Sequence, residues 1–180
     1  MKAEYLNSLS KEIHKNNVAV GWWPEGECIF QKLQLSITEC AEMTEGVRKN
    51  LMDDKLPHYK MEIVECADIM LRSLDVGGRL ELTYEPTGMV HPFIAKGNSA
   101  GMNHLGVSEC ITGFAKAYYS FADDKDKLNL LYSMMIDSIL NCATAQGFNF
   151  AKAMQEKLSF NKTRLDHKLE NRAKEKGKKF

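Results

Sequence analysis

Two stretches decide the fold of this chain, CIFQKLQLSITECAEMTEGVRKN (residues 28–50) and HYKMEIVECADIMLRSLDV (residues 58–76). In the first stretch, apolar or small side chains return every three or four residues, the period of one face of an α-helix. They are Ile29, Leu33, Ile37, Cys40, Ala41, Thr44 and Val47. The intervening Asp53-Asp54-Lys55-Leu56-Pro57 breaks the pattern, and Pro57 can open the next helix. The two stretches therefore predict a helical hairpin, whose second helix stops at Gly77-Gly78.

The same period predicts helices elsewhere in the chain, whereas strand patterns are weak throughout. Further helices are expected at about 3–16, 104–121 and 127–146, with a sixth after Gly147 that Asn149 can cap. We therefore predict an all-α bundle of about six helices, forming a single domain over residues 1–180. The Gly- and Pro-containing stretch up to about Asn103 is long for a connection. It is expected to be a functional flap or to hold structure that the pattern does not reveal.

Composition narrows the class of protein. The chain has 180 residues, 44% hydrophobic and 27% charged, which is a globular composition. Lys+Arg and Asp+Glu both number 24, so no excess charge points to a nucleic acid polymer or a membrane as partner. The sequence shows no signal-peptide pattern and no apolar run near the roughly 20 residues of a membrane span. Five cysteines without a CxxC pair fit reduced thiols, so a cytoplasmic protein is expected.

Four acids in the hairpin form the candidate metal site. Glu39 and Glu42 lie three residues apart in the first helix, and Glu65 and Asp68 three apart in the second. Residues at this spacing share one helical face, so an antiparallel hairpin can direct all four carboxylates into one space. Their mutual repulsion would be relieved by a divalent cation. Oxygen ligands favour Mg²⁺, with Mn²⁺ as a second choice.

Two other interpretations of these acids compete with a magnesium site, and the sequence argues against the second. Each acid alone could be a surface residue that pairs with Lys or Arg at helical spacing. A di-iron bundle would need E-x-x-H motifs, and the sequence contains none. Neutralising Glu42 or Asp68 is expected to abolish Mg²⁺-dependent turnover and to relieve repulsion without loss of stability.

The acid pattern resembles that of the MazG-like all-α nucleotide pyrophosphohydrolases, whose hallmark is E-E-x-x-E followed by E-x-x-D. The chain reads Thr38-Glu39-Cys40-Ala41-Glu42 and Glu65-Cys66-Ala67-Asp68, so Thr38 replaces the first glutamate. The Gly21-Trp22-Trp23 turn, the loop at residues 53–58 and the end of the chain resemble one phage and bacterial subgroup. The likeness covers residues 20–76 and 148–180 and leaves about 78–147 as an inserted segment.

This resemblance implies Mg²⁺-dependent hydrolysis of a (deoxy)nucleoside triphosphate to the monophosphate and pyrophosphate. Glu39 would orient or deprotonate the attacking water. Related dimeric dUTPases carry a Lys…Asn…Arg run, matched here by Lys157, Asn161 and Arg164, which would bind the phosphates. Trp22 and Trp23 could stack on the base or pack the loop on the core. The alternative function is a non-catalytic nucleotide-binding or regulatory protein that keeps the fold.

A weak repeat at an offset of 70 suggests an internal duplication of the hairpin. Glu39-Cys40 matches Glu109-Cys110, and Asp53-Asp54-Lys55 matches Asp123-Asp124-Lys125. If it is real, residues 103–147 should pack on residues 28–76 as a second hairpin without the acids. The matches could also be accidental and the segment an unrelated insertion. Surplus apolar surface on the helix at 127–146 predicts a homodimer with one metal site per chain.

Overall fold

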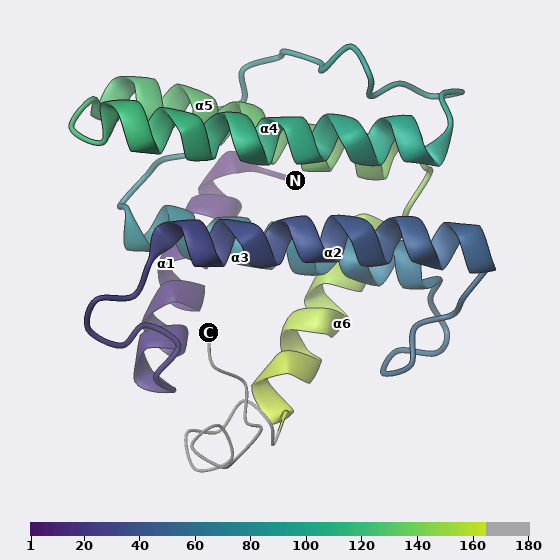
Figure 1. Cartoon of the computed structure of the whole chain (residues 1–180). Helices are drawn as coiled ribbons and strands as arrows, with labels where there is room; N and C mark the ends of the chain where they lie inside the picture. The colour runs from purple at the N-terminus through teal and green to yellow at the C-terminus, as the bar shows by residue number, and fades with distance from the viewer. Residues whose placement is uncertain (165–180) are drawn as a thin grey trace.

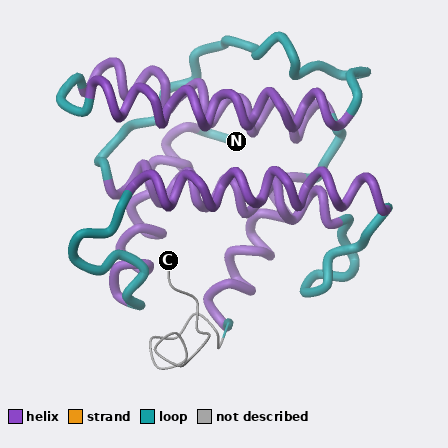
Figure 2. The backbone as a smooth tube through the Cα atoms, in the orientation of Figure 1, coloured by secondary structure: helices purple, strands orange, loops and turns teal. Residues whose placement is uncertain are grey.

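The chain folds into six helices in the computed structural model, which describes residues 1–164 (Figures 1 and 2). They are α1 (Ala3–Ala19), α2 (Ile29–Lys49), α3 (Met61–Arg79), α4 (Ala100–Phe121), α5 (Lys125–Ala145) and α6 (Phe150–Thr163). Within these residues the only β-type pairing is one isolated bridge, between Met52 and Lys60. The all-α prediction is confirmed. None of the six helices combines the length and apolar character that crossing a membrane requires.

Two antiparallel hairpins form the body of the bundle. Figure 1 shows α4 beside α2 and α5 beside α3, each running opposite to its neighbour, as a rough two-fold rotation would place them. The prediction that the second hairpin packs on the first is confirmed. Neither hairpin can bury its apolar face alone, so each covers the other. The residues of α5 that face this core, such as Met135 and Ile139, are fully buried, and Leu130 is left exposed. The homodimer stays a prediction.

The offset of 70 matches the structure only in the first helix of each hairpin. Shifted by 70, α2 falls on residues 99–119, close to α4, whereas α3 would begin at residue 131 and α5 begins at Lys125. Asp124 caps α5 by accepting the backbone N–H of Lys127 at 3.0 Å, while its match Asp54 lies seven residues before α3. The matching aspartates are therefore not in equivalent positions, and a common origin of the hairpins stays a prediction.

Helix α3 lies at the centre and contacts α1, α2, α5 and α6. Gly77 and Gly78 do not end it, contrary to prediction, because the helix continues to Arg79. A Cβ on Gly77 would come within 2.3 Å of the Tyr132 hydroxyl, and one on Gly78 within 2.6 Å of the backbone of α1. The two glycines therefore serve close helix packing. The thiols of Cys40, Cys66 and Cys142 lie in the same core as small buried residues.

The loop before α3 also differs from prediction, since α3 begins at Met61 and Pro57 lies outside it. The carboxylate of Asp53 accepts the backbone N–H groups of Lys55 and Leu56 at 3.0 and 2.6 Å. The N–H of Met61 donates to Leu51 O at 3.1 Å. These bonds close a compact turn that competes with an earlier helix start.

The connection between α3 and α4 is an irregular strap fastened by side chains. Tyr84 exchanges two backbone bonds with the amide of Asn7 on α1, and its hydroxyl donates to Asp137 at 2.7 Å. The other oxygen of Asp137 accepts from the N–H and hydroxyl of Thr87. Figure 1 shows this strap over α4 and α5, on the far side of the bundle from α6. It is bound to the scaffold and does not cover the candidate site described next.

Candidate functional site

Three of the four predicted acids converge between α2 and α3. Glu39 and Glu42, one turn apart on α2, and Glu65 on α3 each offer a carboxylate oxygen within 4.8 Å of the others. Glu39 and Glu65 are buried, whereas Glu42 is exposed. The helical hairpin thus brings together the acids whose spacing predicted a shared face, with one side of the cluster open to solvent.

The cluster is electrostatically strained. Burial, reinforced by the charges of Asp68 and Glu39, raises the pKa of Glu65 to about 9. Burial and the neighbouring Glu39 also raise the pKa of Glu42. Both shifts mark carboxylates that lack enough positive charge around them to ionise freely. A bound cation would reverse them.

Asp68, the fourth predicted acid, faces α6. Its Oδ2 lies 2.9 Å from the ammonium of Lys157, and its Oδ1 accepts from the amide of Asn161 at 3.3 Å. Lys157 is buried, and although burial opposes its charge, Asp68 and Glu65 raise its pKa. Lys157 and Asn161 were predicted to bind phosphate; here both hold Asp68. Their role toward a substrate stays a prediction.

Arg72, which the predicted site omits, pairs with Glu39. Its Nε and Nη2 lie 2.8 and 2.6 Å from the same carboxylate oxygen, Oε1. The sequence contains a usable signal, because Arg72 follows Asp68 by four residues and so shares its helical face. A similar spacing signals Lys32, which lines the cavity described next. It precedes Glu39 by seven residues, two turns of the same helix.

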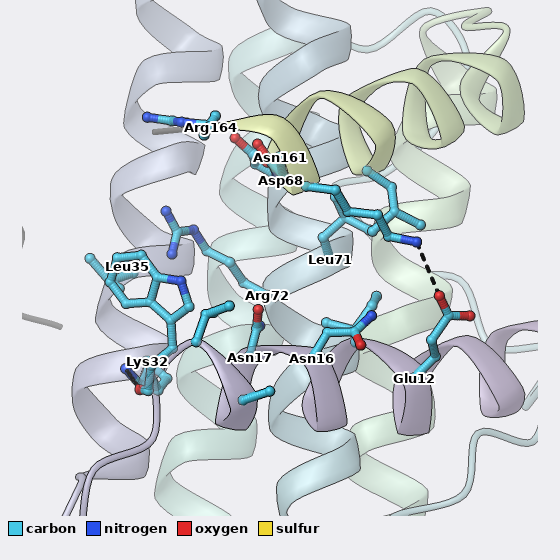
Figure 3. A pocket seen from close by; sticks show the side chains of 16 residues that line it. Glu12, Asn16, Asn17, Lys32, Leu35, Asp68, Leu71, Arg72, Asn161 and Arg164 are labelled. Carbon is cyan, nitrogen blue, oxygen red and sulfur yellow. Dashed lines mark hydrogen bonds and ion pairs between the residues drawn. The ribbon is translucent and has the colours of Figure 1, made fainter. Parts of the chain in front are cut away.

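A cavity of about 990 Å³ adjoins the acids, between α1, α2, α3 and α6 (Figure 3). Asp68 and Arg72 line it and so connect it to the acid cluster. Its other walls combine apolar side chains with amides and cations. They include Ile13, Leu35, Leu71, Leu158, Asn16, Asn17, Lys32, Lys162 and Arg164. A space of this size and mixed lining suits an organic ligand that carries anionic groups.

The two tryptophans of the predicted site separate in the structure. Trp22 lines the cavity. Trp23 packs on the scaffold instead: its indole N–H donates to Asp75 at 3.0 and 3.1 Å, and its ring meets His14 edge-on. Asp75 also accepts from Asn17 at 2.7 Å, so one buried carboxylate fixes the turn against α1. Of the two interpretations offered by the sequence, packing therefore describes Trp23.

Arg164 is the third residue of the predicted phosphate-binding run and does not lie on the helix that carries Lys157 and Asn161. It instead follows the end of α6 as its C-cap, with extended backbone, and its side chain lines the cavity. The rest of the chain end that resembles the phage and bacterial subgroup, residues 165–180, lies outside the described residues.

The residues fit a divalent cation. Three carboxylates within 4.8 Å supply hard oxygen ligands, and the exposed side at Glu42 leaves room for water or substrate oxygens. Burial and the charges of Asp68 and Glu39 raise the pKa of Glu65, and a bound cation would offset them. No protein-family model, curated protein or solved structure matches the chain. A function for this chain is therefore inferred from this geometry and from the sequence.

Replacing Lys157 by Met is expected to destabilise the fold by about 2 kcal/mol, because it leaves the half-buried carboxylate of Asp68 without its cation. Urea unfolding would measure the loss. Lys152→Met is the matched control, since Lys152 lies on the same helix with a side chain 64% exposed. Adding Asp68→Asn to Lys157→Met should cost less than the sum of the two single changes. Additive losses would contradict the pairing.

Proposed function

We propose that this protein hydrolyses a (deoxy)nucleoside triphosphate to the monophosphate and pyrophosphate, with Mg²⁺ bound by Glu39, Glu42 and Glu65. The observation that carries the proposal is the convergence of three carboxylates beside a cavity that contains cationic side chains. It agrees with the resemblance of the acid motifs to MazG-like pyrophosphohydrolases. Mn²⁺ is expected to substitute, because it accepts the same oxygen ligands.

Each group has a distinct part in the proposed reaction. Bound Mg²⁺ would neutralise charge on the phosphates and lower the pKa of a water molecule. Glu39, which pairs with Arg72 in the metal-free structure, would orient or deprotonate that water once the cation is bound. Asp68, held by Lys157 and Asn161, would complete the acid face toward the cavity. Arg164 and Lys162 at the end of α6 provide positive charge for the phosphate chain, and Lys162 pairs with Glu12 of the same cavity at 3.1 Å in this structure.

The cavity would receive the nucleoside part. Its apolar side chains offer surface for a base, Trp22 offers a face for stacking, and the amides of Asn16 and Asn17 lie on α1 at the same cavity (Figure 3). The amide of Asn17 already donates to Asp75. The structure therefore supports a nucleotide as the substrate class without selecting its base.

The test is a screen of common nucleoside and deoxynucleoside triphosphates with Mg²⁺, read as phosphate released by a coupled pyrophosphatase. We expect release with at least one nucleotide, dependent on both Mg²⁺ and the coupling enzyme, and loss of release in EDTA. Phosphate that appears without the coupling enzyme would indicate a different cleavage. Nucleotide binding without any turnover would instead support the alternative, a non-catalytic nucleotide-binding protein.

A further inference from the structure

Arg72 is shared by the acid cluster and the cavity. Its guanidinium donates to Glu39, whose side chain is only 9% exposed, while Arg72 itself is 36% exposed and lines the cavity. Figure 3 shows it between Lys32 on one side and the group of Asp68, Asn161 and Arg164 on the other. A movement of this one side chain would therefore affect both places.

The pairing leaves Arg72 able to change partner. Both of its bonds to Glu39 end on the same oxygen, Oε1, so the guanidinium does not form the two-oxygen fork that is its strongest arrangement with a carboxylate. A phosphate group offers that fork, and guanidinium groups suit it better than ammonium groups do. The cavity next to Arg72 is where such a group would enter.

Arg72 and a divalent cation also compete for the same carboxylate. A cation bound to Glu39 would place two positive charges next to the guanidinium, within the few ångströms at which like charges repel strongly. Among the cations near the cluster, Lys157 is occupied by Asp68, so Arg72 is the direct counter-charge of Glu39.

We propose that Arg72 neutralises Glu39 in the free protein and binds a phosphate oxygen of the substrate once a divalent cation has replaced it at Glu39. The phosphate half of this inference rests on the proposed function, whereas the competition at Glu39 does not. Removing the charge of Arg72 should therefore raise the affinity for a divalent cation and lower the affinity for a phosphate ligand. If Arg72 only positioned Glu39, its removal would change both affinities in the same direction.

The experiment compares the wild type with Arg72→Met by isothermal titration calorimetry, first with Mn²⁺ alone and then with Mn²⁺-tripolyphosphate added to Mn²⁺-saturated protein. We expect Mn²⁺ to bind about tenfold more tightly to Arg72→Met and tripolyphosphate to bind about tenfold more weakly. A tenfold loss of affinity is what removal of one charge-assisted hydrogen bond would cause, at about 1.4 kcal/mol per factor of ten. Arg48→Met is the matched control, because Arg48 is 74% exposed and paired with Glu45 on the outer side of α2. It should leave both affinities unchanged.

Arg72→Lys keeps the proposal testable if the methionine variant does not fold. It retains the charge without the fork, so Mn²⁺ affinity should stay near the wild type while tripolyphosphate binding weakens. Weaker or unchanged Mn²⁺ binding in Arg72→Met would overturn the competition. Unchanged tripolyphosphate binding would overturn the phosphate role. A protein that releases no pyrophosphate but still shows the Mn²⁺ gain would refute the proposed function and leave the competition standing.

Discussion

Replacing Glu42 by Gln is expected to lower the Mg²⁺-dependent turnover by at least about 100-fold while the fold is retained. Mutating residues that only hydrogen-bond to metal ligands already lowers metal affinity or activity by about 10–100-fold. Glu42 would be a ligand itself, so its loss should cost at least as much. Its exposure means that the amide can be accommodated without loss of packing. The measurement is initial velocity of pyrophosphate release over a range of Mg²⁺ concentrations, together with thermal unfolding of the variant.

Glu45→Gln is the control for this change. Glu45 lies one turn further along α2, outside the acid cluster, and pairs with Lys49 and Arg48. It should retain the activity of the wild type. Equal losses in the two variants would indicate a general effect of surface charge, and wild-type activity in Glu42→Gln would remove the assignment of this acid to the metal site.

Replacing Glu65 by Gln is expected to stabilise the metal-free protein at neutral pH. The folded-state pKa of Glu65 is about 9, above its ordinary value of 4.5, because the carboxyl group is buried next to other acids. Below pH 4.5 the group is protonated in both states and costs nothing. As the pH rises above 4.5 the unfolded state ionises first, so stability falls until the pH passes about 9.

At pH 7 the raised pKa of Glu65 lowers the free energy of unfolding by about 3 kcal/mol. The loss amounts to about 1.4 kcal/mol for each pH unit above 4.5. Glu65→Gln should remove this penalty, which urea unfolding in EDTA at pH 5, 7 and 9 would show as a flatter pH profile. Added Mg²⁺ should stabilise the wild type and have less effect on the variant. Glu45→Gln should leave the pH trend intact. A variant that is less stable than the wild type at pH 7 would contradict the prediction.

The structure changes one expectation about the four acids. From the sequence, neutralising Glu42 or Asp68 was expected to relieve repulsion at no cost. The same reasoning now applies to Glu65, which has no cation of its own within the described hydrogen bonds and ion pairs. For Asp68 it reverses, because Asp68→Asn would leave the buried ammonium of Lys157 unpaired. Repulsion can be inferred from spacing, but pairing with a distant helix cannot.

The local geometry of this protein follows from its amino-acid sequence alone. The period of apolar residues predicted six helices, and the three-residue spacing of Glu39–Glu42 and Glu65–Asp68 placed each pair on one face, because both depend only on the 3.6-residue turn. The sequence also predicted that the second hairpin would cover the first, since an amphipathic hairpin must bury its apolar side.

Which carboxylate oxygens meet depends on how the helices pack. The rotation and axial offset of α2 against α3 follow from packing along their whole length, such as the close approach of Gly46 to Met61. That offset brings Glu39, Glu42 and Glu65 together and places Arg72 within ion-pair distance of Glu39. The place of Asp68 depends in turn on α6, a segment about 90 residues further along the chain. No local pattern encodes such contacts, because they depend on how all the helices share one core.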